Sequence, residues 1–311
     1  TKVIDPAVNR GQREIAPNRL MNYLTALFFG LFIPIVVILL INLFDNKIKS
    51  KRDLEKATIV PIAGMIPLSD YGTNLVVMNK SKSSISEAYR SLRTKIKFIM
   101  REPESGIGMV IGVTSSIGGE GKTFTSINLA SVLALGGDSV LLIGGDMRKP
   151  KIFDDFELSN SIGLSSYLSN QTSWEECIQQ TKFDNLSMLS AGPIPPNPSE
   201  LIQSKNFGSL INNIRNKYDY IIVDSPPIGL VTDALQMEPH LDGLFYVTRF
   251  NYTNIESISF LDDQYRQGEL SNVGLIFNGV SAGGGYGYGY GYGYGYGYGY
   301  GYGYGYGYYD N

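Results

Sequence analysis

A short glycine-rich sequence between an apolar run and a helical pattern limits the folds open to this chain more than any other feature. The apolar run covers residues 109–114, and the sequence Ser-Ser-Ile-Gly-Gly-Glu-Gly-Lys-Thr follows it at 115–123. A helical pattern then occupies 122–135. Glycines at a strand end let backbone N–H groups wrap a phosphate chain, and the helix N-terminus adds partial positive charge. The order strand, loop, helix therefore predicts a nucleotide-binding α/β fold.

The residue types in this loop indicate how a nucleotide would be held. Lys122 is expected to meet the β and γ phosphates, and the Thr123 hydroxyl is expected to ligate Mg²⁺. The predicted nucleotide-binding residues of the loop are Gly118, Gly119, Glu120, Gly121, Lys122 and Thr123. In the pattern GxxxxGK[ST] the first glycine would fall at position 116, where this chain has Ser116. That departure is typical of the deviant P-loop group.

Further apolar runs alternate with helical patterns after this loop. Strands are predicted at 109–114, 140–143, 221–223, 244–248 and 273–277, and helices at 86–99, 122–135, 207–216 and 255–267. Strands separated by helices form parallel sheets that are covered on both faces. The predicted fold class is α/β, a doubly wound and mostly parallel sheet of the deviant P-loop NTPase type.

Polar residues at the ends of other predicted strands add to the candidate site. Asp224 ends the apolar run 221–223, and Asp146 and Arg148 follow the run 140–143, with Arg148 expected to bind the nucleotide. Since an Asp at a strand tip beside the P-loop strand can hold Mg²⁺ or its water, we predict that Lys122, Asp146 and Asp224 are catalytic and that Thr123, Asp224 and Asp146 hold the metal. A strand-end Asp is otherwise often a helix cap, but three such stations at one sheet edge favour a site.

An uncharged run of 25 residues, 20–44, lies near the start of the chain. As a helix it spans roughly 37 Å, against about 30 Å for the hydrocarbon core of a bilayer. It predicts a transmembrane helix; a cleaved signal peptide or a buried core helix is the alternative. Lysines and arginines follow it closely at 47–56, which favours a cytoplasmic C-terminal side and a place in the bacterial inner membrane. Because the chain opens at Thr1 without Met, we expect it to be the last part of a longer polypeptide.

The expected divisions of the chain are an extracytoplasmic stub (1–19), a transmembrane helix (20–44), a juxtamembrane linker (45–83), a P-loop domain (84–280) and a tail (281–311). The formal net charge of −3 and the pI of 5.4 give no indication of nucleic acid as a partner. The single cysteine, Cys177, and the single histidine, His240, exclude a disulfide framework and a Cys/His metal site.

The tail is an almost strict alternation of glycine and tyrosine. Disorder is the expectation, because a glycine at every second position leaves the tyrosines without packing neighbours; an aromatic β-stripe that self-associates is the alternative. The thirteen tail tyrosines are Tyr286, Tyr288, Tyr290, Tyr292, Tyr294, Tyr296, Tyr298, Tyr300, Tyr302, Tyr304, Tyr306, Tyr308 and Tyr309.

Taken together, six segments resemble the bacterial tyrosine kinases, the cytoplasmic modules of polysaccharide co-polymerases that control capsule or exopolysaccharide assembly. The segments are 63–67, 87–93, 115–123, 140–150, 192–202 and 220–227. The resemblance covers nearly everything from the apolar helix to the tail. It implies ATP/ADP and Mg²⁺ as cofactors, and the tail tyrosines as phosphoacceptors that enter the active site of a neighbouring subunit.

The resemblance also implies partners. Glu87, Arg90 and Arg93 fit the ExxRxxR helix that joins subunits of such kinases into a homo-oligomeric ring, and their spacing places them along one helical face. From the residues alone, a solvated charged face is the alternative. Besides itself and the membrane, the chain is expected to meet a polysaccharide polymerase, an export pore and a counteracting tyrosine phosphatase. Asn278, at the end of a predicted strand, corresponds to an adenine-recognising Asn in deviant P-loop proteins, or is an ordinary turn residue.

One position departs from the family pattern. The family's Asp-x-Asp-x-Arg motif begins here with Gly144, so the first Asp, commonly assigned as the base toward the acceptor tyrosine, is missing. Either the base is lost, or Asp146 and Asp224 suffice, with a metal-bound water taking the proton. The expected function is an autophosphorylating tyrosine kinase; the alternative is a catalytically impaired, nucleotide-gated scaffold for polysaccharide export. A partitioning ATPase of the same group is disfavoured, because Ile117 occupies the position of its signature lysine.

Overall fold

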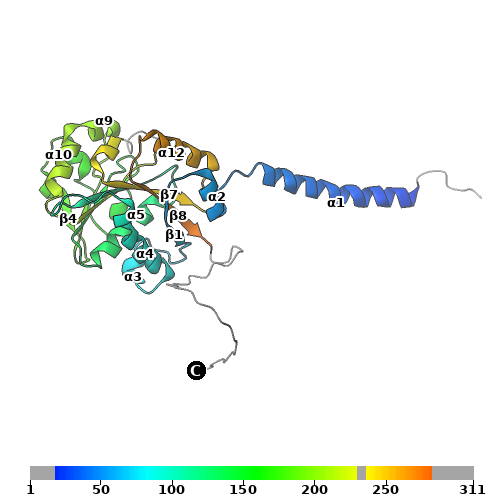
Figure 1. Ribbon diagram of the computed structural model, residues 1–311, viewed down its shortest axis with the longest axis horizontal. Helices are drawn as coiled ribbons and strands as arrows, with labels where there is room; N and C mark the ends of the chain where they lie inside the picture. Colours follow the sequence, from blue (N-terminus) through cyan, green and yellow to red (C-terminus); the bar gives the residue numbers. More distant parts are fainter. Residues whose placement is uncertain (1–17, 230–235, 282–311) are drawn as a thin grey trace, which may run out of the picture.

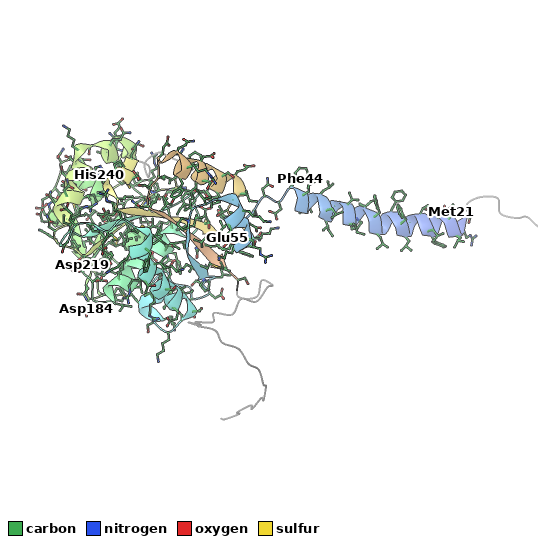
Figure 2. The ribbon with its side chains drawn as sticks, in the orientation of Figure 1. Met21, Phe44, Glu55, Asp184, Asp219 and His240 are labelled. Carbon is green, nitrogen blue, oxygen red and sulfur yellow. The ribbon has the colours of Figure 1, made fainter. Side chains whose placement is uncertain are left out.

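The structure, a computed structural model, describes residues 18–229 and 236–281, in which a long helix stands apart from a folded α/β domain (Figure 1). Helix α1 (Arg19–Leu43) begins after Asn18, whose side chain accepts a hydrogen bond from the Met21 backbone N–H. Its apolar side chains, from Met21 to Phe44, project freely around the helix (Figure 2). By length and composition, α1 is able to cross a membrane.

The described strands of the domain form one eight-stranded sheet with the order β1-β8-β7-β2-β6-β3-β5-β4. All neighbours pair in parallel except β4 and β5. The strands are β1 (Ile62–Pro67), β2 (Met109–Ser115), β3 (Val140–Gly144), β4 (Ile178–Gln180), β5 (Leu186–Leu189), β6 (Tyr220–Asp224), β7 (Gly243–Arg249) and β8 (Val273–Val280). The predicted fold class is confirmed, and the predicted strands are found with their ends moved by one to three residues.

Helices cover both faces of the sheet (Figure 1). They are α2 (Lys51–Ala57), α3 (Val76–Asn79), α4 (Ser84–Ile99), α5 (Lys122–Ala134), α6 (Ile152–Asp155), α7 (Leu164–Leu168), α8 (Trp174–Cys177), α9 (Pro198–Gln203), α10 (Lys205–Ile214), the 3₁₀ helix η1 (Glu238–His240) and α12 (Ile255–Gln267). One core lies between the sheet and α3, α4 and α5; on the other face, α7, α9 and α10 cover one half of the sheet, and α2 and α12 the other. Strand β2 is buried throughout because both of its faces are covered.

The segment predicted as a linker contributes an edge strand to this sheet. Strand β1 pairs with β8, and α4 packs across it, with Leu92 3.4 Å from the position that a Cβ on Gly64 would take, an ordinary van der Waals contact. Helix α4 begins after Ser83, whose hydroxyl accepts from the Ser86 N–H, and it buries an apolar face that includes Tyr89 and Leu92. The boundary predicted at residue 84 therefore lies inside the folded domain. Gly64 and Pro67, which resemble turn residues in the sequence, belong to this edge strand.

Candidate functional site

The P-loop connects β2 to α5 at the carboxyl edge of the sheet. Gly119 and Gly121 have φ angles of 91° and 98°, in the left-handed region that favours glycine. A Cβ on Gly121 would also lie 2.0 Å from the Nδ2 atom of Asn278, so any larger residue would clash there. Both glycines are thus required by the shape of the loop, as the sequence pattern predicts.

Lys122 begins α5 and reaches two carboxylates from neighbouring strands. Its Nζ lies 2.9 Å from Asp146 Oδ2 and 3.9 Å from Asp224 Oδ2, and the three side chains are at most 12% exposed. Burial tends to lower the pKa of Lys122, but Asp224 and Asp146 together outweigh it and raise the pKa above the ordinary value. Lys122 is therefore cationic at neutral pH and ready to meet an anionic ligand.

Asp224 is fixed by hydroxyl groups of α5. Thr123 Oγ1 donates to its Oδ2 at 2.8 Å, and Ser126 Oγ donates to its Oδ1 at 3.1 Å. Burial raises the pKa of Asp224, while the nearby Lys122 ammonium opposes that shift. The sequence analysis missed Ser126, although its place four residues after Lys122, on the same helical face, is a signal for it.

The donors at this edge fit a Mg²⁺ ion. Thr123, Asp224 and Asp146 offer oxygen atoms only, and hard divalent cations prefer oxygen. Mg²⁺ is usually held by one or two carboxylates together with substrate phosphates and water, so a small protein donor set is appropriate. Among the described residues, no group of three or more His, Cys, Asp or Glu side chains offers a competing metal site.

The segment after β3, which we call the β3 motif, contains Asp146 and Arg148 and contacts both the P-loop and the start of α9. Asp146 accepts the Lys149 backbone N–H at 3.1 Å, which fixes the carboxylate that meets Lys122. Arg148 is exposed and donates from Nη2 to Ser199 Oγ at 2.8 Å, at the start of α9. The structure therefore brings Asp146 to the P-loop and joins Arg148 to the start of α9.

Two predicted nucleotide-binding side chains are engaged within the chain. Asn278 donates from Nδ2 to the Glu120 carbonyl at 2.9 Å and accepts the Gly279 N–H on Oδ1. The Glu120 carboxylate is fully buried and accepts from Ser116 Oγ at 2.6 Å and from the Ile117 N–H at 2.9 Å. Both side chains thus stabilise the conformation of the P-loop through hydrogen bonds within the chain. The sequence pattern does not predict this role.

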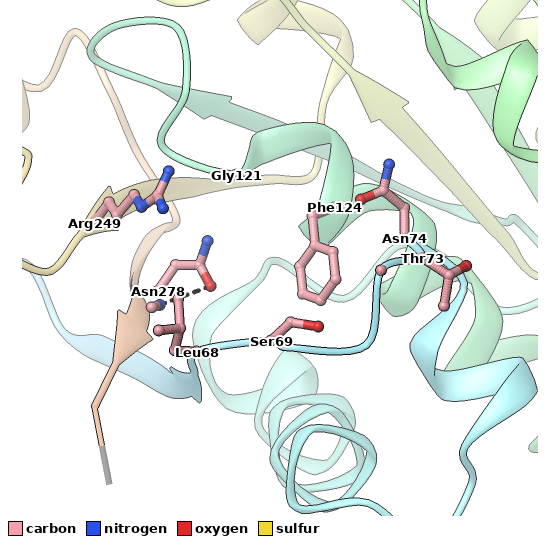
Figure 3. A pocket seen from close by; sticks show the side chains of 10 residues that line it. Leu68, Ser69, Thr73, Asn74, Gly121, Phe124, Arg249 and Asn278 are labelled. Atoms are coloured by element: carbon pink, nitrogen blue, oxygen red, sulfur yellow. Dashed lines mark hydrogen bonds between the residues drawn. The ribbon is translucent and has the colours of Figure 1, made fainter. Parts of the chain in front are cut away.

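A pocket of about 300 Å³ opens beside the P-loop (Figure 3). Asn278 and Arg249 line one side, and the Phe124 ring stands opposite them across the pocket. Ser69 and Thr73, from the loop after β1, also line the pocket. An aromatic face with polar groups around it suits a planar heterocycle.

The predicted oligomerisation residues lie on α4, with Arg93 directed at α5. Glu87 and Arg90 form an ion pair at 2.6 Å along the helix. Arg93 donates to the Val132 carbonyl at 3.2 Å and lies where a Cβ on Gly136 would be, at the C-terminal end of α5. Arg93 thus has a contact within its own chain. The predicted tail phosphoacceptors, Tyr286 to Tyr309, lie outside the described residues.

Comparisons with known proteins show the family to which the chain belongs. A family model described as an AAA domain matches residues 108–237. CapB of Staphylococcus aureus is 44% identical over 160 residues, which cover 51% of this chain and 69% of CapB. The kinase domain of the Escherichia coli tyrosine kinase Etk superimposes with a TM-score of 0.69 at 29% identity, covering 79% of this chain and all of that domain. The chain belongs to the family of bacterial tyrosine kinases.

Two further comparisons show how much of each similar protein the chain spans. The tyrosine-protein kinase Wzc of Salmonella typhi is 32% identical over 296 residues, which cover 90% of this chain and 40% of Wzc. The crystal structure of the chimerical protein CapA2B2 matches with a TM-score of 0.67 and 34% identity, over 75% of this chain and all of that chain. The chain thus spans less than half the length of Wzc and matches whole kinase domains.

Proposed function

We propose that the chain is a membrane-anchored tyrosine kinase that transfers the ATP γ-phosphate to tail tyrosines of a neighbouring subunit. The observation that carries this proposal is the position of the Lys122 ammonium, 2.9 Å from Asp146 and 3.9 Å from Asp224, at the N-terminus of the P-loop helix. A cation, two carboxylates and the Thr123 hydroxyl at one sheet edge form the constellation that phosphoryl transfer requires.

Each residue of the site has a separate role in the proposed phosphoryl transfer. Lys122 would bind the β and γ phosphates, and Thr123 and Asp224 would hold Mg²⁺, which neutralises phosphate charge when bound. The tyrosine oxygen forms a bond to the γ-phosphorus while the bond from that phosphorus to the β,γ-bridging oxygen breaks. Asp146 is the carboxylate placed to accept the phenolic proton, because no side chain is present at Gly144. The pocket beside Asn278 and Phe124 would take the adenine.

The tail and the membrane helix fit an assembly role. Lysines and arginines at 47–56 follow α1, so we place the kinase domain on the cytoplasmic side. Each phosphate adds about −1.5 to −2 charges, so thirteen phosphotyrosines would load the tail with on the order of −20 to −26. Repulsion between such tails would loosen a ring of subunits and thereby control capsule or exopolysaccharide synthesis and export, with the polymerase, the export pore and a phosphatase as partners.

A mixing experiment tests transfer between subunits. A chain lacking residues 282–311 supplies the active site, and a full-length Lys122→Met chain supplies only the tail. With ATP and Mg²⁺, we expect phosphotyrosine on the Lys122→Met tail in the mixture and none with either protein alone, as mapped by mass spectrometry. Native mass measurements before and after phosphorylation report the oligomer. A phosphotyrosine-free mixture that still binds ATP would refute transfer between subunits. A full-length wild-type chain that also forms no phosphotyrosine would refute the kinase proposal and favour a scaffold. An unchanged oligomer would refute the loosening of the ring.

A second candidate function, the nucleotide-gated scaffold, rests on Gly144. This residue pairs in register with Asp224, so a side chain at 144 would lie on the same face of the sheet, beside that carboxylate. In this chain a Cβ there would be 3.1 Å from both the Ala191 nitrogen and Ile152 Cγ2. Neighbouring groups have therefore closed around the glycine, and the family's first Asp would have to displace the Ile152 side chain.

Restoring the carboxylate distinguishes the two candidates. We expect Gly144→Asp combined with Ile152→Ala, which removes the crowding Cγ2 methyl group, to phosphorylate the tail up to about 100-fold faster than Ile152→Ala alone, the lower end of what a positioned base contributes. The initial rate of phosphotyrosine formation at saturating ATP is the measurement. Equal rates in both variants would show that Asp146 already suffices. Detectable activity only in the variant that carries Gly144→Asp would show that the natural chain is a scaffold.

A further inference from the structure

The last residue of β7 and the loop that leads to α12, residues 249–254, hold the P-loop from outside. Arg249 Nη1 donates to the Gly119 carbonyl at 2.7 Å, and the Tyr252 hydroxyl donates to the Gly118 carbonyl at 2.9 Å. The Arg249 guanidinium also lies 5.5 Å from the centroid of the Tyr252 ring, so the two donors are held together. We call residues 249–254 the clamp loop.

Thr253 of the clamp loop reaches the interior of the P-loop. Its hydroxyl donates to the fully buried carboxylate of Glu120, and it accepts the Arg249 backbone N–H at 2.8 Å. The same Glu120 carboxylate accepts hydrogen bonds from the Ser116 hydroxyl and from the Ile117 N–H. Loss of the Thr253 hydroxyl would therefore leave the buried Glu120 carboxylate short of one donor and remove a link between the clamp loop and the P-loop.

The clamp loop is in turn held by the segment that follows the membrane helix. The Ile48 N–H donates to the Thr253 carbonyl at 2.9 Å, and the Asn251 N–H donates to the Ile48 carbonyl at 2.8 Å. The Ile48 side chain is fully buried in the core under α2 and α12. Because α1 ends at Leu43, only a few residues separate the membrane helix from this contact.

We propose that the clamp loop is a positioning element for the P-loop, and that residues 46–48 set the affinity of the P-loop for nucleotide by holding Thr253 in place. Thr253 joins the two partners directly, since its carbonyl binds Ile48 and its hydroxyl binds Glu120. A change in the position of α1 is thereby transmitted to the nucleotide site without any contact between the two. The inference rests on the proposed nucleotide-binding function of the P-loop.

Substitutions at Thr253 test the clamp. Thr253→Val keeps the shape and removes the hydroxyl, whereas Thr253→Ser keeps the hydroxyl. Calorimetric titration of the full chain in detergent with ADP and Mg²⁺ should show about tenfold weaker binding for Thr253→Val, since hydrogen bonds to charged groups contribute roughly this much. Thr253→Ser, which loses the methyl group and keeps the hydroxyl, should bind ADP within about twofold of the wild type. If Thr253 acted only through the packing of its methyl group, Thr253→Ser would instead be the variant with weakened binding.

The link to residues 46–48 can be tested in the reverse direction, from nucleotide binding to the contacts of Ile48. If nucleotide stabilises the clamp loop, ADP with Mg²⁺ must also slow hydrogen exchange of the Ile48 and Asn251 amides in the wild type, and must not do so in Thr253→Val. Ile48→Pro, which removes the donor to Thr253, should weaken ADP binding like Thr253→Val, and the double variant should lose no more than either one, since both act on one path. Ile48→Ala retains the N–H and controls for the buried side chain.

The experiments distinguish failure of the proposed nucleotide binding from failure of the clamp and from failure of the link to residues 46–48. A wild-type chain that binds no ADP would overturn the proposed function and this inference with it. Normal ADP binding by the wild type and equally by Thr253→Val would refute the clamp alone. Exchange of Ile48 that is unchanged by ADP, or affinity losses that multiply in the double variant, would show that residues 46–48 do not act through Thr253. If Ile48→Pro does not fold, the exchange measurement on the wild type still decides.

Discussion

Lys122→Met should reduce tail phosphorylation by about 100- to 1,000-fold, the loss measured when one preorganised donor to transition-state charge is removed. Methionine has a similar length but no charge, so the two carboxylates on either side, Asp146 and Asp224, would face the phosphates without their cation. Phosphate binding should weaken as well, because the ammonium is the only described side-chain cation within ion-pair distance of both carboxylates. The measurements are the rate of phosphotyrosine formation and the affinity for ADP.

Lys149→Met provides the matched control. Lys149 lies in the same β3 motif and is exposed, and it contacts Asp146 through its backbone N–H, which the substitution leaves in place. We expect its phosphorylation rate to stay within about threefold of the wild type, as for other surface substitutions. A Lys122→Met rate that matched that of Lys149→Met would remove Lys122 from the catalytic group.

The core of the fold was predictable because central parallel strands are buried on both faces. The predicted strands 109–114 and 140–143 appear in the sequence as almost entirely apolar runs, and no helix pattern competes with them. The edge of the sheet gave weaker signals. Strand β1 contains Gly64 and Pro67, which indicate a turn, and β4 is only three residues long. In these strands pairing with a distant partner, not local pattern, decides the structure.

The site was predictable to the extent that it follows directly from strand ends. Asp224 ends β6, Asp146 follows β3, and the P-loop that leads to Lys122 and Thr123 follows β2; the carboxyl ends of such parallel strands meet at one edge. The support behind the P-loop was not predictable in this way. Glu120 is held by Thr253, which lies 133 residues along the chain, and both residue types are common at exposed turns. Only the folded chain shows that these two side chains meet inside it.

A stability prediction concerns the hydrogen-bond network of Asp242 and Arg215 at the start of β2. Asp242 accepts the Val110 N–H at 2.7 Å and the Arg215 Nη1 at 2.9 Å, and its side chain is 12% exposed. Arg215 further donates to the His240 carbonyl at 3.1 Å. This network joins the start of β2 to the end of α10 and to the segment before β7. Asp242→Ala leaves the Arg215 charge and the Val110 N–H without this partner, which we expect to cost about 3 kcal/mol, the low end for a broken buried ion pair.

For a domain of this size, such a loss corresponds to a fall in Tm of roughly 6–12 °C. Thermal unfolding followed by near-ultraviolet circular dichroism measures it, and Asp263→Ala, at an exposed position on α12, is the control that should leave Tm almost unchanged. Arg215→Met in both backgrounds completes a double-mutant cycle and isolates the pair. Because β2 leads directly into the P-loop, we also expect Asp242→Ala to weaken ADP binding near its Tm. A fall in Tm no larger than that of Asp263→Ala would show that the Arg215 network does not hold the start of β2 in place.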